Sequence, residues 1–225
     1  MRTPVTTCPD RDRLAEPGCS RRSYLSPLVV RLLARASLLI GLVPALYGVA
    51  YELNAATRAG APVAVPVRIR DLNGLQIRQA GLGTGSWLQA GAGPVTLHAD
   101  GGTVAEWLAS RGGGAVVGVC IGLGALLLYR LLLSIAGGQP FQRGNAARIA
   151  GMAGLVVVAT VSAGVLPYVA ARLALDRLGL GGHSSPVAAH LTISAVPLLL
   201  ALFLLALAEA FRRGLELAKD TEGLV

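Results

Sequence analysis

The sequence predicts an all-α integral membrane protein: a four-helix transmembrane bundle with a small β-rich extracytoplasmic loop domain between helices one and two. Only 14% of the 225 residues are charged and 53% are hydrophobic, whereas soluble domains carry about 25% charged residues. Four stretches supply the ~20 apolar residues that a helix needs to cross a bilayer core of about 30 Å. A long segment between the first two alternates apolar residues with a period of two, which is typical of strands.

The four predicted spans cover residues 32–51, 112–136, 149–171 and 187–208. Each is too long and too uniformly apolar for a helix of an ordinary soluble core. The fourth contains a single ionisable residue, His190, about one turn from its start. Prolines inside three of the spans indicate kinks, which bilayer helices tolerate when neighbouring helices satisfy the freed carbonyl groups. We expect the lipid bilayer to be the main partner of the chain.

The placement of basic residues predicts the orientation. Seven of the twenty Lys and Arg residues fall within the first 35 residues, and three follow span four. Arg130 lies near the end of span two, and Arg143 and Arg148 lie between spans two and three. Basic residues accumulate on the cytoplasmic side, so both termini are expected there, in a multi-pass protein of the cytoplasmic (inner) membrane. Residues 1–25 are then a disordered cytoplasmic N-terminus and residues 26–225 the membrane domain. The net charge of +8 is a topology signal on this interpretation, and we expect no direct binding to nucleic acid.

The extracytoplasmic loop, residues 53–111, carries strand patterns. Val63, Val65, Val67 and Ile69 alternate with small or polar residues, and residues 75–77 repeat the alternation after a turn-like Asp-Leu-Asn-Gly. This pattern predicts a hairpin, and the stretch GPVTLHAD at residues 93–100 can supply a further strand. The loop is therefore expected to form a cap of about three short strands against the outer ends of the helices.

Gly114, Gly118 and Gly122 lie four residues apart in the second span. Glycines at this spacing line one face of a helix and allow another backbone to approach closely. They predict a packing seam, either within one chain or between the subunits of a homo-oligomer.

The connection between spans two and three predicts a tight hairpin. Gly137 and Gly138 are suited to end the second helix with positive φ, and Asn145 to cap the third helix through its side chain. This connection contains no acidic residue. Our hypothesis is that Glu209 pairs with Arg130 or Arg148 and clamps the helix ends, and the alternative is a proton-coupling carboxylate at Glu209.

Residues 209–222 are expected to continue the fourth helix into the cytoplasm. Phe211, Leu215 and Ala218 fall on one helix face, and the spacing predicts ion pairs of Glu209 with Arg213 and of Arg212 with Glu216. Gly223 then ends the helix.

No catalytic, cofactor or metal site is expected. The histidines have no acidic residue at ligand spacing, the three cysteines form neither a disulfide framework nor a zinc motif, and no nucleophile or phosphate-loop motif occurs. The sequence therefore indicates a protein that is not an enzyme.

Two stretches, GGQPFQRGNAARIAG at residues 137–151 and AEAFRRGLELAKDTEGLV at residues 208–225, resemble the DUF2975 family of bacterial integral membrane proteins, whose activity is not established. The resemblance covers residues ~30–225. The matching residues of the first stretch are Gly138, Pro140, Phe141, Asn145 and Arg148. Those of the second are Glu209, Phe211, Arg212, Gly214, Leu217, Asp220, Glu222, Gly223, Leu224 and Val225.

Proteins of that family are often encoded beside a small helix-turn-helix regulator. The resemblance therefore implies a non-enzymatic signalling or regulatory protein that contacts a cytoplasmic helix-turn-helix regulator through the hairpin and the charged C-terminal helix. A small transporter or channel-like subunit is the alternative.

Overall fold

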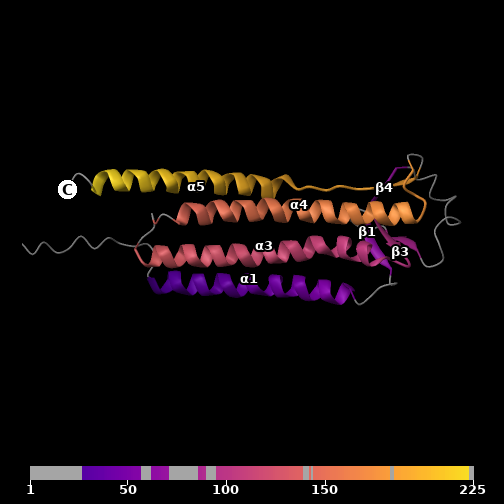
Figure 1. Ribbon diagram of the computed structural model, residues 1–225, viewed down its shortest axis with the longest axis horizontal. Helices are drawn as coiled ribbons and strands as arrows, with labels where there is room; N and C mark the ends of the chain where they lie inside the picture. Colours follow the sequence, from indigo (N-terminus) through magenta and orange to yellow (C-terminus); the bar gives the residue numbers. More distant parts are fainter. Residues whose placement is uncertain are drawn as a thin grey trace, which may run out of the picture.

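The computed structural model describes residues 27–56, 62–70, 86–89, 95–138, 142, 144–182 and 185–222. The predicted disordered segment, residues 1–25, lies outside this part of the chain. The described residues form four long helices and, at one end of them, a small β-sheet (Figure 1). The helices are α1 (Pro27–Ala56), α3 (Val104–Ala136), α4 (Asn145–Arg177) and α5 (Ala195–Glu222). All four are long and apolar enough to cross a membrane.

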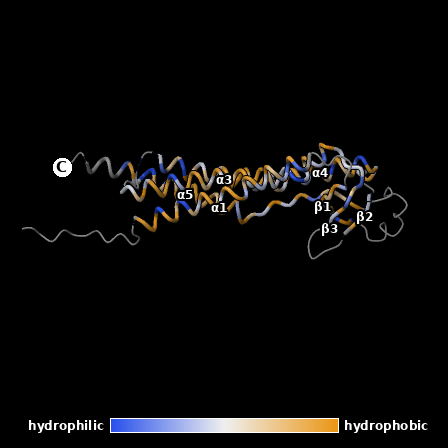
Figure 2. Tube along the Cα trace, turned by 90° about the horizontal axis from the view of Figure 1, so that it is seen from below, coloured by the Kyte–Doolittle hydropathy of each residue, from blue (hydrophilic) through white to orange (hydrophobic). Residues whose placement is uncertain are grey.

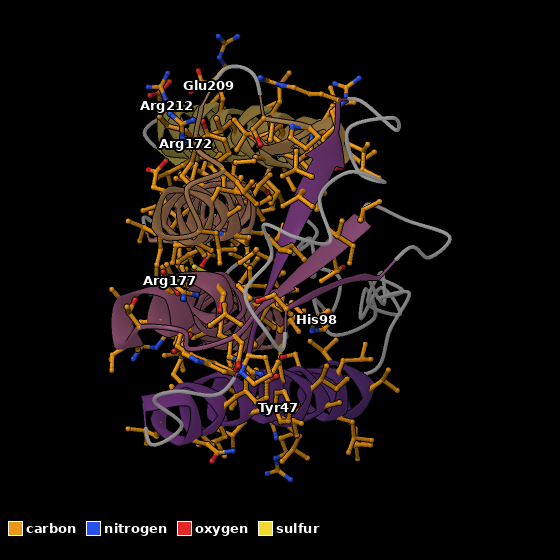
Figure 3. The ribbon with its side chains drawn as sticks, turned by 90° about the vertical axis from the view of Figure 1, so that its right-hand side faces the viewer. Tyr47, His98, Arg172, Arg177, Glu209 and Arg212 are labelled. Carbon is orange, nitrogen blue, oxygen red and sulfur yellow. The ribbon has the colours of Figure 1, made fainter. Side chains whose placement is uncertain are left out.

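The four apolar helices of the predicted bundle are confirmed, and they lie side by side in a single layer. Among the described residues α1 packs along α3, α3 along α4 and α4 along α5, and no extensive contact joins α1 to α5. The end-on view shows the four helices stacked in one row (Figure 3). No more than 22% of the most apolar window of any helix is buried, and hydrophobic residues predominate in the middle of the helix layer (Figure 2). Among the described residues, no second layer of helices covers either face of this one.

Three of the predicted spans are contained in α1, α3 and α4, but the start of the fourth is wrong. Residues 187–189 form a strand, residues 190–194 are not helical, and α5 begins only at Ala195. The predicted helix at 209–222 is confirmed as the second half of α5. The connection between α1 and α3 is shorter than predicted, residues 57–103 instead of 53–111, because α1 runs to Ala56 and α3 begins at Val104.

A capping box explains the early start of α3. The side chain of Thr103 accepts a hydrogen bond from the backbone N–H of Glu106 (3.3 Å), and the backbone N–H of Thr103 donates to Oε2 of Glu106 (3.2 Å). These two bonds satisfy amide groups that the first turn of a helix otherwise leaves unpaired.

The sheet has four antiparallel strands in the order β2-β3-β1-β4. They are β1 (Val63–Ile69), β2 (Trp87–Gln89), β3 (Val95–Ala99) and β4 (Val187–Ala189). β1 and β3 confirm two of the predicted strands, whereas β4 comes from a segment predicted to be helical. Residues 75–77, the predicted hairpin partner of β1, lie outside the described residues. β1 pairs instead with β3 through residues 63–67 and with β4 through residues 67–69.

The main hydrophobic core lies between the sheet and the ends of α3 and α4. Val63, Val65 and Val67 point to one face of β1, as their period of two requires, and are completely buried. They contact the last turns of α4, where alanines at 170, 171 and 174 let the sheet approach closely, and Trp107 of α3. This core confirms the predicted cap against the helix ends, and we call this end of the layer the sheet end.

The glycine seam packs within one chain, between α1 and α3. A Cβ atom on Gly118 would collide with the carbonyl oxygen of Pro44, and one on Gly122 would lie 2.8 Å from Cβ of Ala45. Gly114 differs, because a Cβ atom there would meet nothing within 4 Å. Two of the three predicted glycines therefore form the seam, and the third borders open space.

Candidate functional site

At the end of the layer opposite the sheet, which we call the hairpin end, Asn145 joins α3 to α4. Asn145 is completely buried; its Nδ2 donates to Oγ of Ser134 (2.7 Å), and its Oδ1 accepts from Nη1 of Arg148 (2.7 Å). The same nitrogen of Arg148 also donates to the backbone oxygen of Arg130 (3.3 Å). The predicted cap at Asn145 is wrong, since Gly144 occupies the N-cap position without a side-chain bond. Asn145 instead connects the two helices through its side chain.

The turn before α4 was predicted only in part. Both glycines of this turn were expected to have a positive φ. Gly137 ends α3 with φ −78°, whereas Gly138 has a positive φ of 76°. The family-matching residues Pro140 and Phe141 lie outside the described part of the chain.

Glu209 of α5 does not clamp α3 or α4, so that hypothesis is wrong. Its carboxylate accepts hydrogen bonds from Arg212 (2.7 and 2.8 Å) and from Arg213 (2.9 Å) on its own helix. Arg212 also donates to Glu216 at 2.9 Å. The two predicted i,i+4 pairs are thus confirmed and joined by an i,i+3 pair into one network. The side chains are between 41% and 72% exposed, so the network forms a charged surface of α5.

Phe211 faces the other way from this network. It packs on a hydrophobic cluster formed by Leu131 of α3, Ile149 of α4 and Ala208 of α5. Gly214 and Leu215 are half-buried one turn further along. Phe211 therefore anchors α5 to the layer. The side chains of Leu217, Ala218 and Glu222, and all of Gly223, lie outside the described part of the structure.

The C-terminal end of α5 continues past the ends of the other three helices (Figure 1). The charged network is carried on a helix that packs on the layer at Phe211, and the side chains of the network are exposed. This arrangement presents an ordered row of two acidic and two basic side chains.

A buried ion pair at the sheet end was missed by the sequence reasoning. Nε of Arg177 donates to Oε1 of Glu106 at 2.9 Å, and Nη1 of Arg177 donates to the backbone oxygen of Asp100, also at 2.9 Å. The Glu106 side chain is 2% exposed and that of Arg177 29%. An acid in the first turn of α3 and a base in the last turn of α4 also complement the two helix dipoles. The Thr-x-x-Glu pattern of residues 103–106 was the available signal.

An aromatic and arginine cluster lies where α1 and α3 reach the sheet end. The guanidinium carbon of Arg111 lies 4.2 Å from the ring centroid of Tyr51 and 4.6 Å from that of Trp107. Tyr47 and Tyr51 stack with their centroids 5.6 Å apart. Both helices contribute residues at i,i+4 spacing, a signal that sequence reasoning did not use. Glu52 lies beside this cluster, and both of its carboxylate oxygens are buried and form no hydrogen bond with the described residues.

The link between β4 and α5, residues 190–194, runs along α4. The carbonyl oxygen of Thr192 would lie 2.7 Å from a Cβ atom on Gly164, so this position of α4 must be glycine for the link to lie so close. His190 begins the link and is not part of a helix. In the described part of the chain, the backbone groups of residues 191–193 form no hydrogen bonds.

Metal-binding side chains do not gather anywhere in the described ranges: no three His, Cys, Asp or Glu residues come together as ligands would. The structure thus offers a charged helix surface at one end of the layer and an aromatic cluster at the other. Comparison of the chain with protein-family models, with curated proteins and with solved structures finds no match.

Proposed function

We propose that the chain is a non-enzymatic protein of the cytoplasmic membrane with a signalling or regulatory role, and that the charged surface of α5 is where a cytoplasmic partner binds. Glu209, Arg212, Arg213 and Glu216 form this surface. The resemblance of two stretches to the DUF2975 family supports a helix-turn-helix regulator as the partner.

The length and exposure of the helices support insertion in a bilayer. α3 and α4 have 33 residues each, which corresponds to about 50 Å of helix, whereas the hydrocarbon core is about 30 Å thick. Apolar side chains are exposed along α1 and α5, with Ile40 72% and Val196 73% exposed. Lipid would cover such residues, and the surplus length would carry the sheet beyond the outer surface.

The single observation that carries the regulatory proposal is the separation of two faces on α5. Phe211 packs inward on the hairpin-end cluster while the arginines and glutamates face outward. A helix that is anchored by one face presents the other in a fixed orientation. Interfaces of this kind obtain specificity from complementary charge.

Co-purification from the native membrane tests this proposal. The substitution Arg213→Glu reverses one charge at a side chain that is 72% exposed and leaves the pairs of Arg212 intact. Recovery of a DNA-binding regulator with the wild-type chain, and its loss with Arg213→Glu, would support the proposal. The matched control is Arg172→Glu, at an exposed position of α4. Equal recovery with all three chains, or no regulator at all, would count against it.

A small transporter or channel-like subunit is the second candidate, and the buried carboxylate of Glu52 favours it. Ionisable groups inside membrane helices commonly line the paths of ions and protons. Solute or ion flux in liposomes that disappears with Glu52→Gln would support this function. The helix arrangement argues against a pore, because the described helices form a single layer that encloses no lumen.

A further inference from the structure

A groove of about 460 Å³ lies between α1 and α3 at the aromatic cluster. Gly48 on α1, and Gly114 and Gly118 on α3, line it. Gly114 borders its open space, whereas Gly48 and Gly118 let the two backbones approach closely. Its wall on α3 runs from Ser110 to Ile121, which corresponds to about 16 Å along the helix axis. This length suits an extended hydrocarbon chain better than a compact polar molecule.

One end of the groove is charged. Arg111 lines it, and its guanidinium group is held between the rings of Tyr51 and Trp107. Cation–π contacts fix a guanidinium group through its face and leave its N–H groups, which lie at the edge, free to donate. No hydrogen bond or ion pair of Arg111 with a described residue occupies those donors. The guanidinium group is therefore positioned to donate hydrogen bonds to an anion from outside the chain, although Glu52 is its acidic neighbour within the chain.

The rest of the wall is apolar. Pro44, Val117 and Ile121 continue the groove away from Arg111, towards the middle of the helices. Arg111 directly precedes residue 112, where the apolar span begins, and Tyr and Trp side chains concentrate at the level of lipid headgroups. The polar end would thus lie at the membrane surface and the apolar end within the hydrocarbon core.

We propose that this groove binds an anionic membrane lipid, with the headgroup phosphate on Arg111 and one acyl chain along the glycine face of α3. Arginine donates two parallel hydrogen bonds to a phosphate group, which gives it orientation as well as charge. Tyr47 and Tyr51 place hydroxyl-bearing rings beside the same end. The proposal depends on membrane insertion, but not on a cytoplasmic partner.

Glu52 allows the role of charge in lipid binding to be tested, because its removal and the removal of Arg111 should change the affinity in opposite directions. Its carboxylate lies near Gly112, with Oε1 3.5 Å from the position of a Cβ atom there, and it does not line the groove. Because it is the acid beside Arg111 in the described structure, its removal should strengthen the binding of an anion. Glu52→Gln should therefore raise the affinity for anionic lipid while Arg111→Gln lowers it.

Gly114 allows the shape of the groove to be tested independently of its charge. A side chain at Gly114 would enter open space, so Gly114→Leu should fill the groove and leave the contacts between α1 and α3 in place. Gly124 provides the matched control, because it lies on the same helix, also borders open space and does not line the groove.

The experiment is native mass spectrometry of the purified full chain in detergent with phosphatidylglycerol or phosphatidylcholine. We expect phosphatidylglycerol to bind about tenfold more tightly. Both lipids carry a phosphate, but the choline cation of phosphatidylcholine cancels its charge and is repelled by Arg111, whereas phosphatidylglycerol has a net negative headgroup. Arg111→Gln should abolish the preference between the two lipids, and Gly114→Leu should weaken the binding of both. Free glycerol 1-phosphate should not compete at millimolar concentration, since it lacks the acyl chain; competition would point to a soluble phosphate ligand and overturn the lipid assignment.

Two further results would overturn the proposal: an unchanged preference in Arg111→Gln, or equal lipid binding by Gly114→Leu and Gly124→Leu. Circular dichroism of each variant establishes that it is folded, and Gly114→Leu retains Arg111 in case Arg111→Gln does not fold. If the wild-type chain is extracted from cells without detergent, membrane insertion itself fails. If the chain requires detergent for extraction but shows no lipid preference, only the lipid proposal fails.

Discussion

The ion pair between Glu106 and Arg177 allows a quantitative prediction. The substitution Arg177→Gln removes the donors of two hydrogen bonds, one to the Glu106 carboxylate and one to the backbone oxygen of Asp100. It leaves behind a carboxylate whose side chain is only 2% exposed. Glu106 also belongs to the capping box of α3, so it cannot turn towards water without releasing the backbone N–H of Thr103.

The expected cost follows from the burial of the two partners. Removing one partner of a buried ion pair destabilises a protein by about 3–5 kcal/mol. The lower end applies here, about 3 kcal/mol, because Glu106 keeps one hydrogen bond. Replacing the other partner, Glu106→Gln, should cost only about 1–2 kcal/mol. Arg177 is 29% exposed and can be hydrated when it loses Glu106, and glutamine still serves in a capping box.

Amide hydrogen exchange of the chain in detergent measures this difference locally. Opening of the sheet end exposes β1, β3 and the first turns of α3, so a loss of about 3 kcal/mol should speed their exchange roughly 100-fold. The hairpin end should be unaffected. Arg172→Gln is the control, because Arg172 is an exposed arginine of the same helix. In the double variant, Glu106→Gln with Arg177→Gln, exchange should be slower than in Arg177→Gln alone.

The reasoning is refuted if Arg177→Gln and Arg172→Gln accelerate exchange equally. It also fails if the double variant exchanges faster than either single variant, since a buried charge without a partner could not then be the cause.

The remaining predictions concern the seam, the hairpin end and the orientation. Gly118→Ala should lower the free energy of unfolding by about 1–3 kcal/mol through overpacking against α1, while Gly114→Ala changes it by less than about 0.5 kcal/mol; denaturant titration in detergent distinguishes them. Asn145→Ala should cost about 1–3 kcal/mol, because Arg148 and Ser134 lose a buried partner, and a thermal melt equal to wild type would contradict this. In a cysteine-free chain, a cysteine at Asp100 should react with an impermeant maleimide on intact cells and one at Glu216 only after permeabilisation; the opposite pattern would reverse the proposed orientation.

The sequence was sufficient to predict the helices because the prediction depends only on the summed hydropathy of a segment. Any run of about 20 apolar residues meets this condition, whatever its partners in the fold. The start of the fourth span was missed for the same reason. Residues 187–194 have the hydropathy of a membrane helix, yet three of them complete the edge of the sheet beside β1. His190, Thr192 and Ser194 alternate with Leu191 and Ile193, a period of two that indicated extended chain and that hydropathy averaging conceals.

The candidate sites were predicted less well than the fold, because their partners are distant in the sequence. The pairs within α5 follow from i,i+4 spacing alone and were correct. Glu106 and Arg177 are 71 residues apart, and only the packing of α3 on α4 brings them together. Asn145 shows the same limit: its residue type indicated a helix terminus, but its partner Ser134 depends on how the hairpin folds.

The link at residues 190–194 sets the position of the charged end of α5 relative to the outer sheet. An extended residue advances the chain by about 3.3 Å and a helical one by 1.5 Å. Each residue that the first turn of α5 gains from the link, or loses to it, therefore shifts the helix along its axis by roughly 1.8 Å. Each such change of one residue also rotates the helix by about 100°. This rotation is enough to turn the charged surface of α5 from one side of the layer towards another. The axial position and the rotation of α5 are thus coupled through the length of this link. The close contact between Thr192 and Gly164 fixes both of them.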